Sequence, residues 1–385
     1  MSAVMDRFIP YANPGSYGIT TELWRADRYG NLIEQIDPSL VESGQVSMNE
    51  DMTPKRRLAI DVLDPYAFTP LHDWLVPVVA LSDPEGNTVA ERQGLYLVVP
   101  PETVAAPSGV TGTVHGLDGT QLLHMATRDD AVIPAGMDRG AYARQLAFEV
   151  GFVPDQVRIP DTGVLQPEDR RFDPGSTVYS IMSDVLSNSN YYAPWANQDG
   201  IIVTAPYLPL TSASPVWTYR NTNDLDALDL EGIITESPDW QRLANKVTVR
   251  RMGSGDTPTL SATARNENVE SPSSIPALGY EISRPLPIDM HDAGWQDATD
   301  EEIEAALQAH AEAVLSEAAS LYRKITVQTF PSLNADVHQV IGLDIQIGGR
   351  QVYDGRWWRT GWTLTLDGGN STFTSNLARV EEWKP

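Results

Sequence analysis

The sequence predicts a mainly β protein that carries an α+β insertion and one long amphipathic helix. Apolar residues alternate with polar ones at period two in several runs, as Leu58, Ile60 and Val62 do. Short loops rich in Pro, Gly, Asn and Asp separate these runs, which is typical of strands joined by hairpins. One long segment near residue 300 instead repeats its apolar residues every three or four positions, which is the helical period.

Length and charge narrow the class of protein. The chain has 385 residues, enough for two to four domains with buried cores. It contains no cysteine, which excludes disulfides, thiolate metal sites and cysteine nucleophiles. Its 27 basic and 52 acidic residues give a formal net charge of −25, which disfavours tight nucleic-acid binding because phosphates are repelled. Such acidity suits a channel through which DNA slides without adhering, or it serves solubility alone.

The sequence contains no segment that suggests a membrane span. No apolar run approaches the roughly 20 residues that a spanning helix needs. Residues 1–10 include Asp6 and Arg7 and lack the continuous apolar region of a secretion signal. We therefore expect a soluble chain that neither inserts into a membrane nor leaves the cell by the general secretion pathway.

Residues 18–118 are predicted to form an antiparallel sheet. Gly18–Arg28 and Asn31–Ile36 are expected to form a hairpin. The loop Asp83–Asn87 places Pro early and Gly late, as a hairpin connection needs when one residue adopts a positive φ angle. Trp74–Leu81 and Val89–Val99 should therefore be antiparallel neighbours.

The order of these elements resembles the first barrel of a known family of viral proteins. The residues that carry the resemblance are Trp24, Tyr29-Gly30-Asn31, Ser43–Val46, Arg56–Asp61, Leu75–Pro77, Gly94–Tyr96 and Val114–Asp118. The family is that of bacteriophage tail hub or baseplate hub proteins, the minor tail proteins that form a ring at the tip of the tail. The resemblance is one of architecture, and it extends weakly over nearly the whole chain.

A helical region follows the first barrel. Asp138 begins a segment with apolar residues every fourth position, and Gly151 lies where a helix end favours a left-handed residue. A second helix is predicted over Ser176–Leu186, with the surface loop Pro154–Pro174 between the two. The dipeptide Asp199-Gly200 predicts a hairpin turn. These elements resemble the small α/β insertion domain of the hub family.

The clearest helix of the chain begins at Thr299. Thr299 and Glu302 form a capping box, and Arg323 and Lys324 place positive charge at the end of the segment. Its apolar face is expected to lie on a second barrel. Before it, Gly253–Ser274 is expected to be a loop or a linker. The strands expected after the helix are Ile325–Phe330, Val340–Gly348, Gln351–Trp358, Gly361–Leu366 and Asn376–Glu382.

The resemblance implies a fold with two tail-tube-like β-barrels, a small α/β domain and the long amphipathic helix. The expected organisation is an N-terminal arm (1–17), a first barrel (18–118), an α/β insertion (119–205) and a second barrel (252–385) that contains the helix 299–324. The first barrel is expected to be completed by about 206–251, where Asn245–Val249 is the most strand-like piece.

The sequence predicts no catalytic, cofactor-binding or metal-binding residues. The usual enzyme motifs HExxH, GxSxG, the Walker loop and SxxK are absent. A metal site built from His72, His291 and His338 meets no spacing rule, so these are interpreted as solvated loop histidines.

Two other groups of residues have a structural and a functional interpretation. The acidic residues Asp300, Glu301, Glu302 and Glu304 would suit a glycosidase pair, but capping of the helix explains them. Trp357, Trp358 and Trp362 would suit a sugar platform if they were exposed, but alternating strand positions favour a core or a subunit seam. Neither group is assigned a catalytic role.

The sequence therefore predicts a structural hub protein of a phage tail tip and not an enzyme. The resemblance implies a homotrimeric ring that joins the sixfold tail tube to the threefold tip, lines the DNA channel and is assembled in the host cytoplasm. Its implied partners are the distal tail protein or tail tube, the tape-measure protein and the tip or central fibre proteins. Two alternatives stay open at this point: a tail-associated cell-wall or polysaccharide hydrolase, and a carbohydrate-binding β protein.

Overall fold

The structure is a computed structural model. It describes residues 18–82, 85–107, 109–207, 213–221, 234–237, 243–251, 260–286, 299–320, 323–329, 332–367 and 371–380. The predicted arm 1–17 and His291 lie outside the described residues. The mainly β fold with helical insertions is confirmed, and most strands belong to one continuous, largely antiparallel sheet of 14 strands. No closed barrel is found among the described strands.

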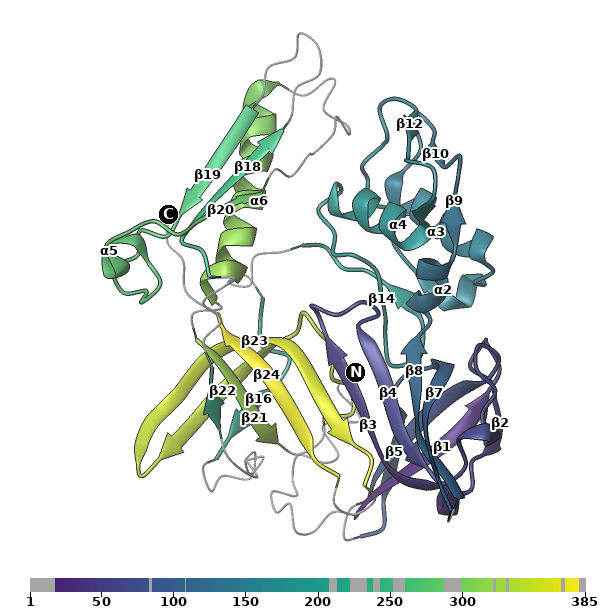
Figure 1. Ribbon diagram of the computed structural model, residues 1–385. Coiled ribbons are helices and arrows are strands. Elements are labelled where there is room, and N and C mark those ends of the chain that lie inside the picture. Colours follow the sequence, from purple (N-terminus) through teal and green to yellow (C-terminus); the bar gives the residue numbers. More distant parts are fainter. Residues whose placement is uncertain are drawn as a thin grey trace.

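One end of the large sheet, here called the first half, is built from the N-terminal strands (Figure 1). Its strands are β1 (Gly18–Ala26), β2 (Leu32–Gln35), β3 (Val41–Asn49), β4 (Arg56–Val62), β5 (Trp74–Ser82), β6 (Thr88–Arg92), β7 (Tyr96–Ala106) and β8 (Gly109–Asp118). They lie in the order β3-β4-β8-β7-β5-β1-β2, with β6 also paired to β5. The predicted hairpin partners are confirmed, because Val78 pairs with Arg92 and Leu75 with Tyr96.

The other end, the second half, is built from strands that follow the insertion. Its strands are β16 (Thr218–Arg220), β17 (Thr235–Glu236), β21 (Lys324–Thr329), β22 (Val340–Ile347), β23 (Arg350–Thr365) and β24 (Phe373–Arg379). Residues 351–358 and 361–366, which were predicted as separate strands, form the single strand β23, because a register shift between Arg359 and Gly361 lets the strand continue.

Strand β23 joins the two halves. Before its register shift it pairs with β22, and after the shift Gly361–Thr365 pairs with β3 of the first half. A Cβ atom at Gly361 would approach the Met48 carbonyl oxygen to 2.7 Å, so glycine permits this close contact. Trp362 and Leu364 then enter the hydrophobic core of the first half. The two halves therefore share one sheet and one part of a core.

The two halves repeat one strand order. In the first half, strands β1, β3, β4, β5, β7 and β8 lie in the order β1-β5-β7-β8-β4-β3. In the second half, strands β16, β17, β21, β22, β23 and β24 lie in the order β16-β22-β23-β24-β21-β17. If the six strands of each half are numbered 1 to 6 by their order in the sequence, both halves have the spatial order 1-4-5-6-3-2. They differ in that β1 is antiparallel to β5, whereas β16 is parallel to β22.

The insertion unit contains three helices around a core of its own. The helices are α2 (Thr120–Met125), α3 (Arg139–Val150) and α4 (Val178–Ser187). The predicted ends of α3 are confirmed, because Asp138 accepts a hydrogen bond from the Ala141 N–H and Gly151 has a φ of 100°. The short strands of the unit are β9 (Thr127–Arg128), β10 (Val132–Ile133), β11 (Val157–Arg158), β12 (Arg170–Arg171), β13 (Ser176–Thr177), β14 (Trp195–Ala196) and β15 (Ile202–Val203).

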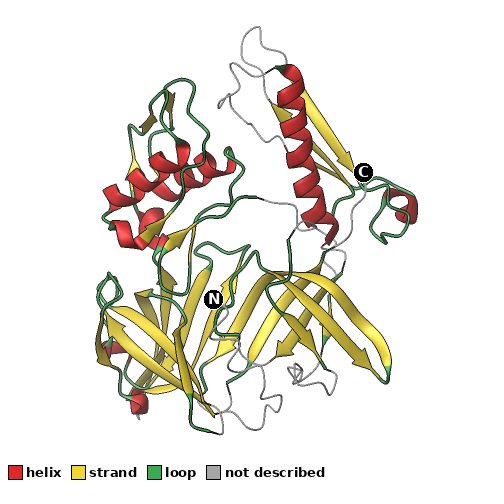
Figure 2. Cartoon of the chain, turned by 180° about the vertical axis from the view of Figure 1, so that it is seen from behind, coloured by secondary structure: helices red, strands yellow, loops and turns green. Residues whose placement is uncertain are grey.

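A second α/β unit, here called the helix–sheet unit, contains the long helix. Its elements are β18 (Lys246–Arg251), β19 (Leu260–Arg265), α5 (Ile275–Leu278), β20 (Ser283–Leu286) and α6 (Asp300–Ser320). Strand β18 pairs with β19 and β20 to form a separate small sheet. Figure 2 shows both α/β units on the same side of the large sheet.

Three expectations about this region are wrong. Strand β18 does not complete the first half, and β16 and β17 pair with β22 and β21 of the second half. Helix α6 does not lie on the second half: its apolar face packs on β18 and β19, because Val247 and Val249 offer the apolar surface that the helix needs. The region 253–274 is not all linker, since it contains β19. The other domain boundaries stay a prediction.

The face of α6 can be tested by substitution. Leu307 is fully buried against the small sheet, whereas Glu304 is exposed. We expect Leu307→Asp to lower the free energy of unfolding by several kcal/mol, because it buries an unpaired charge. Glu304→Gln is the matched control and should be nearly neutral. Equal shifts in thermal melting for the two variants would contradict this packing.

Candidate functional site

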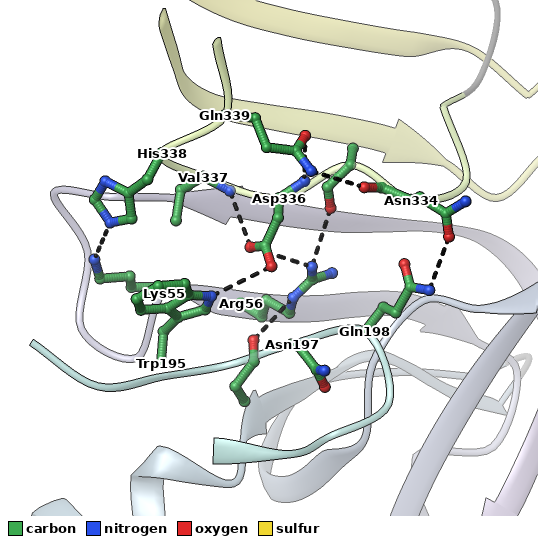
Figure 3. A network of polar contacts seen from close by, with 12 residues as sticks. Lys55, Arg56, Trp195, Asn197, Gln198, Asn334, Asp336, Val337, His338 and Gln339 are labelled. Carbon is green, nitrogen blue, oxygen red and sulfur yellow. Dashed lines mark hydrogen bonds and ion pairs between the residues drawn. The ribbon is translucent and has the colours of Figure 1, made fainter. Parts of the chain in front are cut away.

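A buried polar junction connects the insertion unit to both halves of the sheet (Figure 3). Three segments meet there: Lys55 and Arg56 at the start of β4, the hairpin around Trp195–Gln198, and the loop 333–339 that precedes β22. The three segments lie about 140 residues apart in sequence. The junction therefore fixes the relative positions of units that the chain alone leaves far apart.

Arg56 lies at the centre of the junction and is 1% exposed. Its Nε donates to the Ala196 carbonyl at 3.1 Å, and its Nη2 donates to the Ala335 carbonyl at 3.1 Å. The guanidinium carbon also lies 5.1 Å from the centre of the Trp362 ring. One side chain thus bonds to the insertion unit and the second half while it stacks on the strand that joins the halves.

The counter-charge to Arg56 is Asp336. Its Oδ1 lies 3.6 Å from Arg56 Nη2, and its Oδ2 accepts a hydrogen bond from Trp195 Nε1 at 3.3 Å. Burial raises the pKa of Asp336, and the Arg56 charge opposes that shift. Asn334, in the same loop as Asp336, accepts a hydrogen bond through its Oδ1 from Gln198 Nε2 of the hairpin at 2.9 Å. The tip of the hairpin is therefore held by charge and by amide groups together.

A second group of contacts surrounds His338. Lys55 Nζ lies 3.1 Å from His338 Nε2 and 5.5 Å from the centre of the Trp195 ring. The imidazole stacks on Tyr192 with ring centres 3.8 Å apart. Burial, and then the charge of Lys55, lower the pKa of His338 well below its usual range. A neutral imidazole can accept a hydrogen bond from the lysine, which suits this geometry.

Contacts beyond the junction extend it to the helix–sheet unit. Tyr192 donates its hydroxyl hydrogen to Glu317 Oε1 of α6 at 2.8 Å, and His310 Nδ1 lies 3.1 Å from Asn190 Oδ1. On the other side, Arg359 Nη1 donates to Gln339 Oε1 at 2.7 Å. All four units of the chain thus meet around one connected set of polar side chains.

The Arg56 backbone is also fixed. Its N–H donates to Asp118 Oδ2 at 2.8 Å, and Asp118 is fully buried at the end of β8. Thr120 donates to the other carboxylate oxygen through its backbone N–H at 2.8 Å. Burial raises the pKa of Asp118, and these hydrogen bonds oppose the shift. Asp118 therefore ties the start of α2 to the backbone of Arg56, the central residue of the junction.

The structure locates the histidines and acidic residues that the sequence singled out. The His338 side chain is only 9% exposed, so its interpretation as a solvated loop histidine is wrong. The His72 side chain is 82% exposed. No group of three or more His, Asp or Glu in the described part of the chain is arranged to hold a metal ion. The capping box is confirmed, because Thr299 and Glu302 exchange hydrogen bonds.

The tryptophans are core residues. Trp357, Trp358 and Trp362 are each at most 1% exposed, so the structure gives them no surface on which a sugar could stack. Among the described residues, no helix is both long and apolar enough to cross a membrane. Most polar groups of the junction bond to one another, although Arg56 Nη1 and His338 Nδ1 have no hydrogen-bond partner within the part of the chain that the structure describes.

Sequence reasoning missed Lys55 and Arg56 as junction residues. Arg56 was singled out only as part of the segment Arg56–Asp61 that carries the family resemblance, and Lys55 was given no role. The signal that could have found Arg56 is its place in the alternation, because residues 56, 58, 60 and 62 all point to the core. A charged residue in such a register must find buried partners.

The junction predicts a pH-dependent stability. Below a pH of about 6.5 the unfolded chain protonates His338 and the folded chain does not, so the free energy of unfolding falls as the pH falls. We expect the loss between pH 7.5 and 5.5 to be about 1 kcal/mol smaller in His338→Gln than in the unchanged protein. His72→Gln, at an exposed site, is the control and should follow the unchanged protein. Urea unfolding at the two pH values measures the difference, and parallel curves for all three proteins would contradict it.

Comparison with solved structures places the fold. The tail protein from Neisseria meningitidis MC58 is similar with a TM-score of 0.60 and 12% identity, covering 95% of this chain and 98% of that one. The 43 kDa tail protein of prophage MuSo2 from Shewanella oneidensis is similar with a TM-score of 0.61 and 11% identity, covering 94% and 100%. A chain of the lidded Francisella PdpA–VgrG complex is similar with a TM-score of 0.51 and 8% identity, covering 96% and 53%.

These similarities identify the fold. The chain has the fold of phage tail proteins over nearly its whole length, and the resemblance to the tail and baseplate hub family is confirmed at that level. No protein-family model matches the sequence, and no curated protein matches it.

Proposed function

We propose that this protein is the structural hub of a phage tail tip, a homotrimeric ring that joins the sixfold tail tube to the threefold tip. The observation that carries the proposal is the repeated strand order of the two halves. Each chain contributes two similar sheet units, so three chains present six units around a ring. Such a ring matches a sixfold tube on one side and has true threefold symmetry for the tip on the other.

The junction gives this hub its mechanical role. A ring at the tail tip must hold its units in fixed positions until attachment, and Arg56 bonds to two units at once. The proposed partners are the distal tail protein or tail tube, the tape-measure protein and the tip or central fibre proteins. The proposed location is the tail tip of the virion, after assembly in the host cytoplasm. The proposed role is not enzymatic.

The proposal includes passage of DNA through the ring without specific binding. A net charge of −25 repels phosphates, so we expect no detectable binding of duplex DNA at physiological salt. A gel-shift titration checks this. Tight binding that weakens steeply with salt would contradict the channel and leave the acidity as a solubility device.

The mass of the native protein tests the hub most simply. At micromolar concentration and above, native mass measurement should show three chains. A stable dimer or tetramer would contradict the proposal. Loss of turbidity from a peptidoglycan suspension on adding the purified protein would instead favour the hydrolase alternative.

A further inference from the structure

We propose that the outer edge of β7, at Glu102–Ala105, pairs as an antiparallel strand with the outer edge of β17 in a second copy of this chain. The inference rests on the proposed ring and names the two strands that close it. Its basis is a contact already present within each chain. That contact is the pairing of β23 with β3, which joins the second half to the first.

The two strands of the proposed contact occupy the same places in the repeat as β23 and β3. Strand β7 corresponds to β23. Strand β7 pairs with β5, which precedes it in the repeat, and with β8, which follows it, just as β23 pairs with β22 and β24. Each also contains a register shift, at Val99/Glu102 and Arg359/Gly361. Strand β17 corresponds to β3, because β17 pairs with β21 as β3 pairs with β4. The chain thus contains each kind of strand twice. One pair, β23 and β3, is joined within the chain, whereas β7 and β17, as far as the structure describes them, are not joined to each other.

Both edges of the proposed contact are unpaired within the part of the chain that the structure describes. Among the described residues, Glu102–Ala106 pairs only with β8, and Thr235–Glu236 pairs only with β21. Residues 102–106 are all exposed, and Val104 is 66% exposed. In the corresponding part of β23, Trp362 and Leu364 are each 1% exposed. An open strand edge of this kind is a template for another strand.

The position of Thr235 follows from the strands beside it. In the first half, Ala59 lies between the buried Leu58 and Ile60 and pairs with Gln45. In the second half, Thr326 lies between the buried Ile325 and Val327 and pairs with Thr235. Thr235 therefore occupies the position of Gln45.

The position of Val104 follows from the other neighbouring strand. Leu58 pairs with Gly116, and five residues earlier in β8 Thr111 pairs with Val104. Ile325 pairs with Leu377, and five residues earlier Thr372 accepts a hydrogen bond from the backbone N–H of Thr365. Val104 therefore occupies the position of Thr365. Because Thr365 pairs with Gln45 within the chain, Val104 should lie opposite Thr235 of the next copy.

The contact is head-to-tail. One free edge belongs to the first half and the other to the second half, so each copy offers both and neither pairs with itself. A heterologous contact of this kind builds a ring when its rotation closes. Three copies linked in this way give six sheet units joined by six equivalent strand pairings, three within chains and three between them.

Disulfide cross-linking tests the register, because the chain has no cysteine of its own. We expect the double variant Val104→Cys/Thr235→Cys to form a covalent trimer on oxidation, seen on a non-reducing gel. Residues directly opposite in an antiparallel pair lie within the Cα separation that a disulfide spans. Gln45→Cys/Thr365→Cys is the matched positive control and should form a disulfide within one chain. Val104→Cys/Glu236→Cys is the negative control, because neighbouring residues of a strand point to opposite faces.

Each outcome decides the matter. A trimer by native mass that cross-links at Val104 and Thr235 supports the proposal. A trimer that fails to cross-link, while the positive control does, overturns the strand pairing and leaves the hub standing. Covalent dimers that never proceed to trimers indicate a self-complementary contact and also overturn it. A protein that stays monomeric and shows no cross-link up to hundreds of micromolar overturns the ring and the pairing together. All cysteine sites are at least partly exposed, and thermal melting confirms folding.

Discussion

Arg56→Leu should lower the free energy of unfolding by ~3–5 kcal/mol, because it leaves the partly buried Asp336 without its counter-charge. It also leaves the carbonyls of Ala196 and Ala335 without their donor. The neighbour Arg57 is the matched control: it is only half-buried, and its hydrogen bonds to the carbonyls of Thr53 and Pro54 are long, at 3.4 Å. Arg57→Leu should therefore change stability by less than about 0.5 kcal/mol.

Urea unfolding of the two variants measures the difference. The unchanged protein and Arg57→Leu should unfold at similar urea concentrations, and Arg56→Leu should unfold much earlier. Limited proteolysis adds a second readout, because loosening of the junction should expose the hairpin around Trp195. Equal stability of Arg56→Leu and Arg57→Leu would show that the junction does not hold the units together.

Trp362→Ala should lower the free energy of unfolding by a similar ~3–5 kcal/mol. Trp362 belongs to β23 of the second half, yet it packs in the core of the first half and stacks on Phe373 with ring centres 5.6 Å apart. Its removal leaves a large cavity where the two halves meet. The exposed Tyr66, at 72%, is the control, and Tyr66→Ala should be nearly neutral. A Trp362→Ala protein that melts with the unchanged protein would contradict the shared core.

Local signals explain which parts of the fold could be predicted. The ends of α3, the capping box at Thr299 and the hairpin that follows β5 each depend on residues within a few positions of one another. The pairing of strands that lie far apart in the sequence left no such local signal. Nothing near Gly361 or Gln45 indicates that they lie on neighbouring strands, because any two half-buried strands of suitable length can pair.

The long helix shows the same limit from another side. Its apolar stripe was predicted, because Ile303, Leu307 and Val314 recur at the helical period. The stripe indicates that an apolar surface covers this face of the helix, but it does not indicate which surface. The small sheet of β18 and β19 supplies that surface in place of the second half.

The repeat of the two halves was invisible in the sequence for a related reason. Equivalent positions share burial and not identity, as Leu58 and Ile325 do, and many apolar residues satisfy the same position. The junction was hidden because the partners of Arg56 lie 140 and about 280 residues away. A basic residue on a strand looks exposed until those partners are in place.

A low-resolution projection of the purified protein tests the central claim most directly. The account predicts a ring with threefold symmetry, six similar lobes and a central hole, because each of three chains contributes two units with one strand order. A compact particle without a hole, or a particle with twofold symmetry, would contradict it.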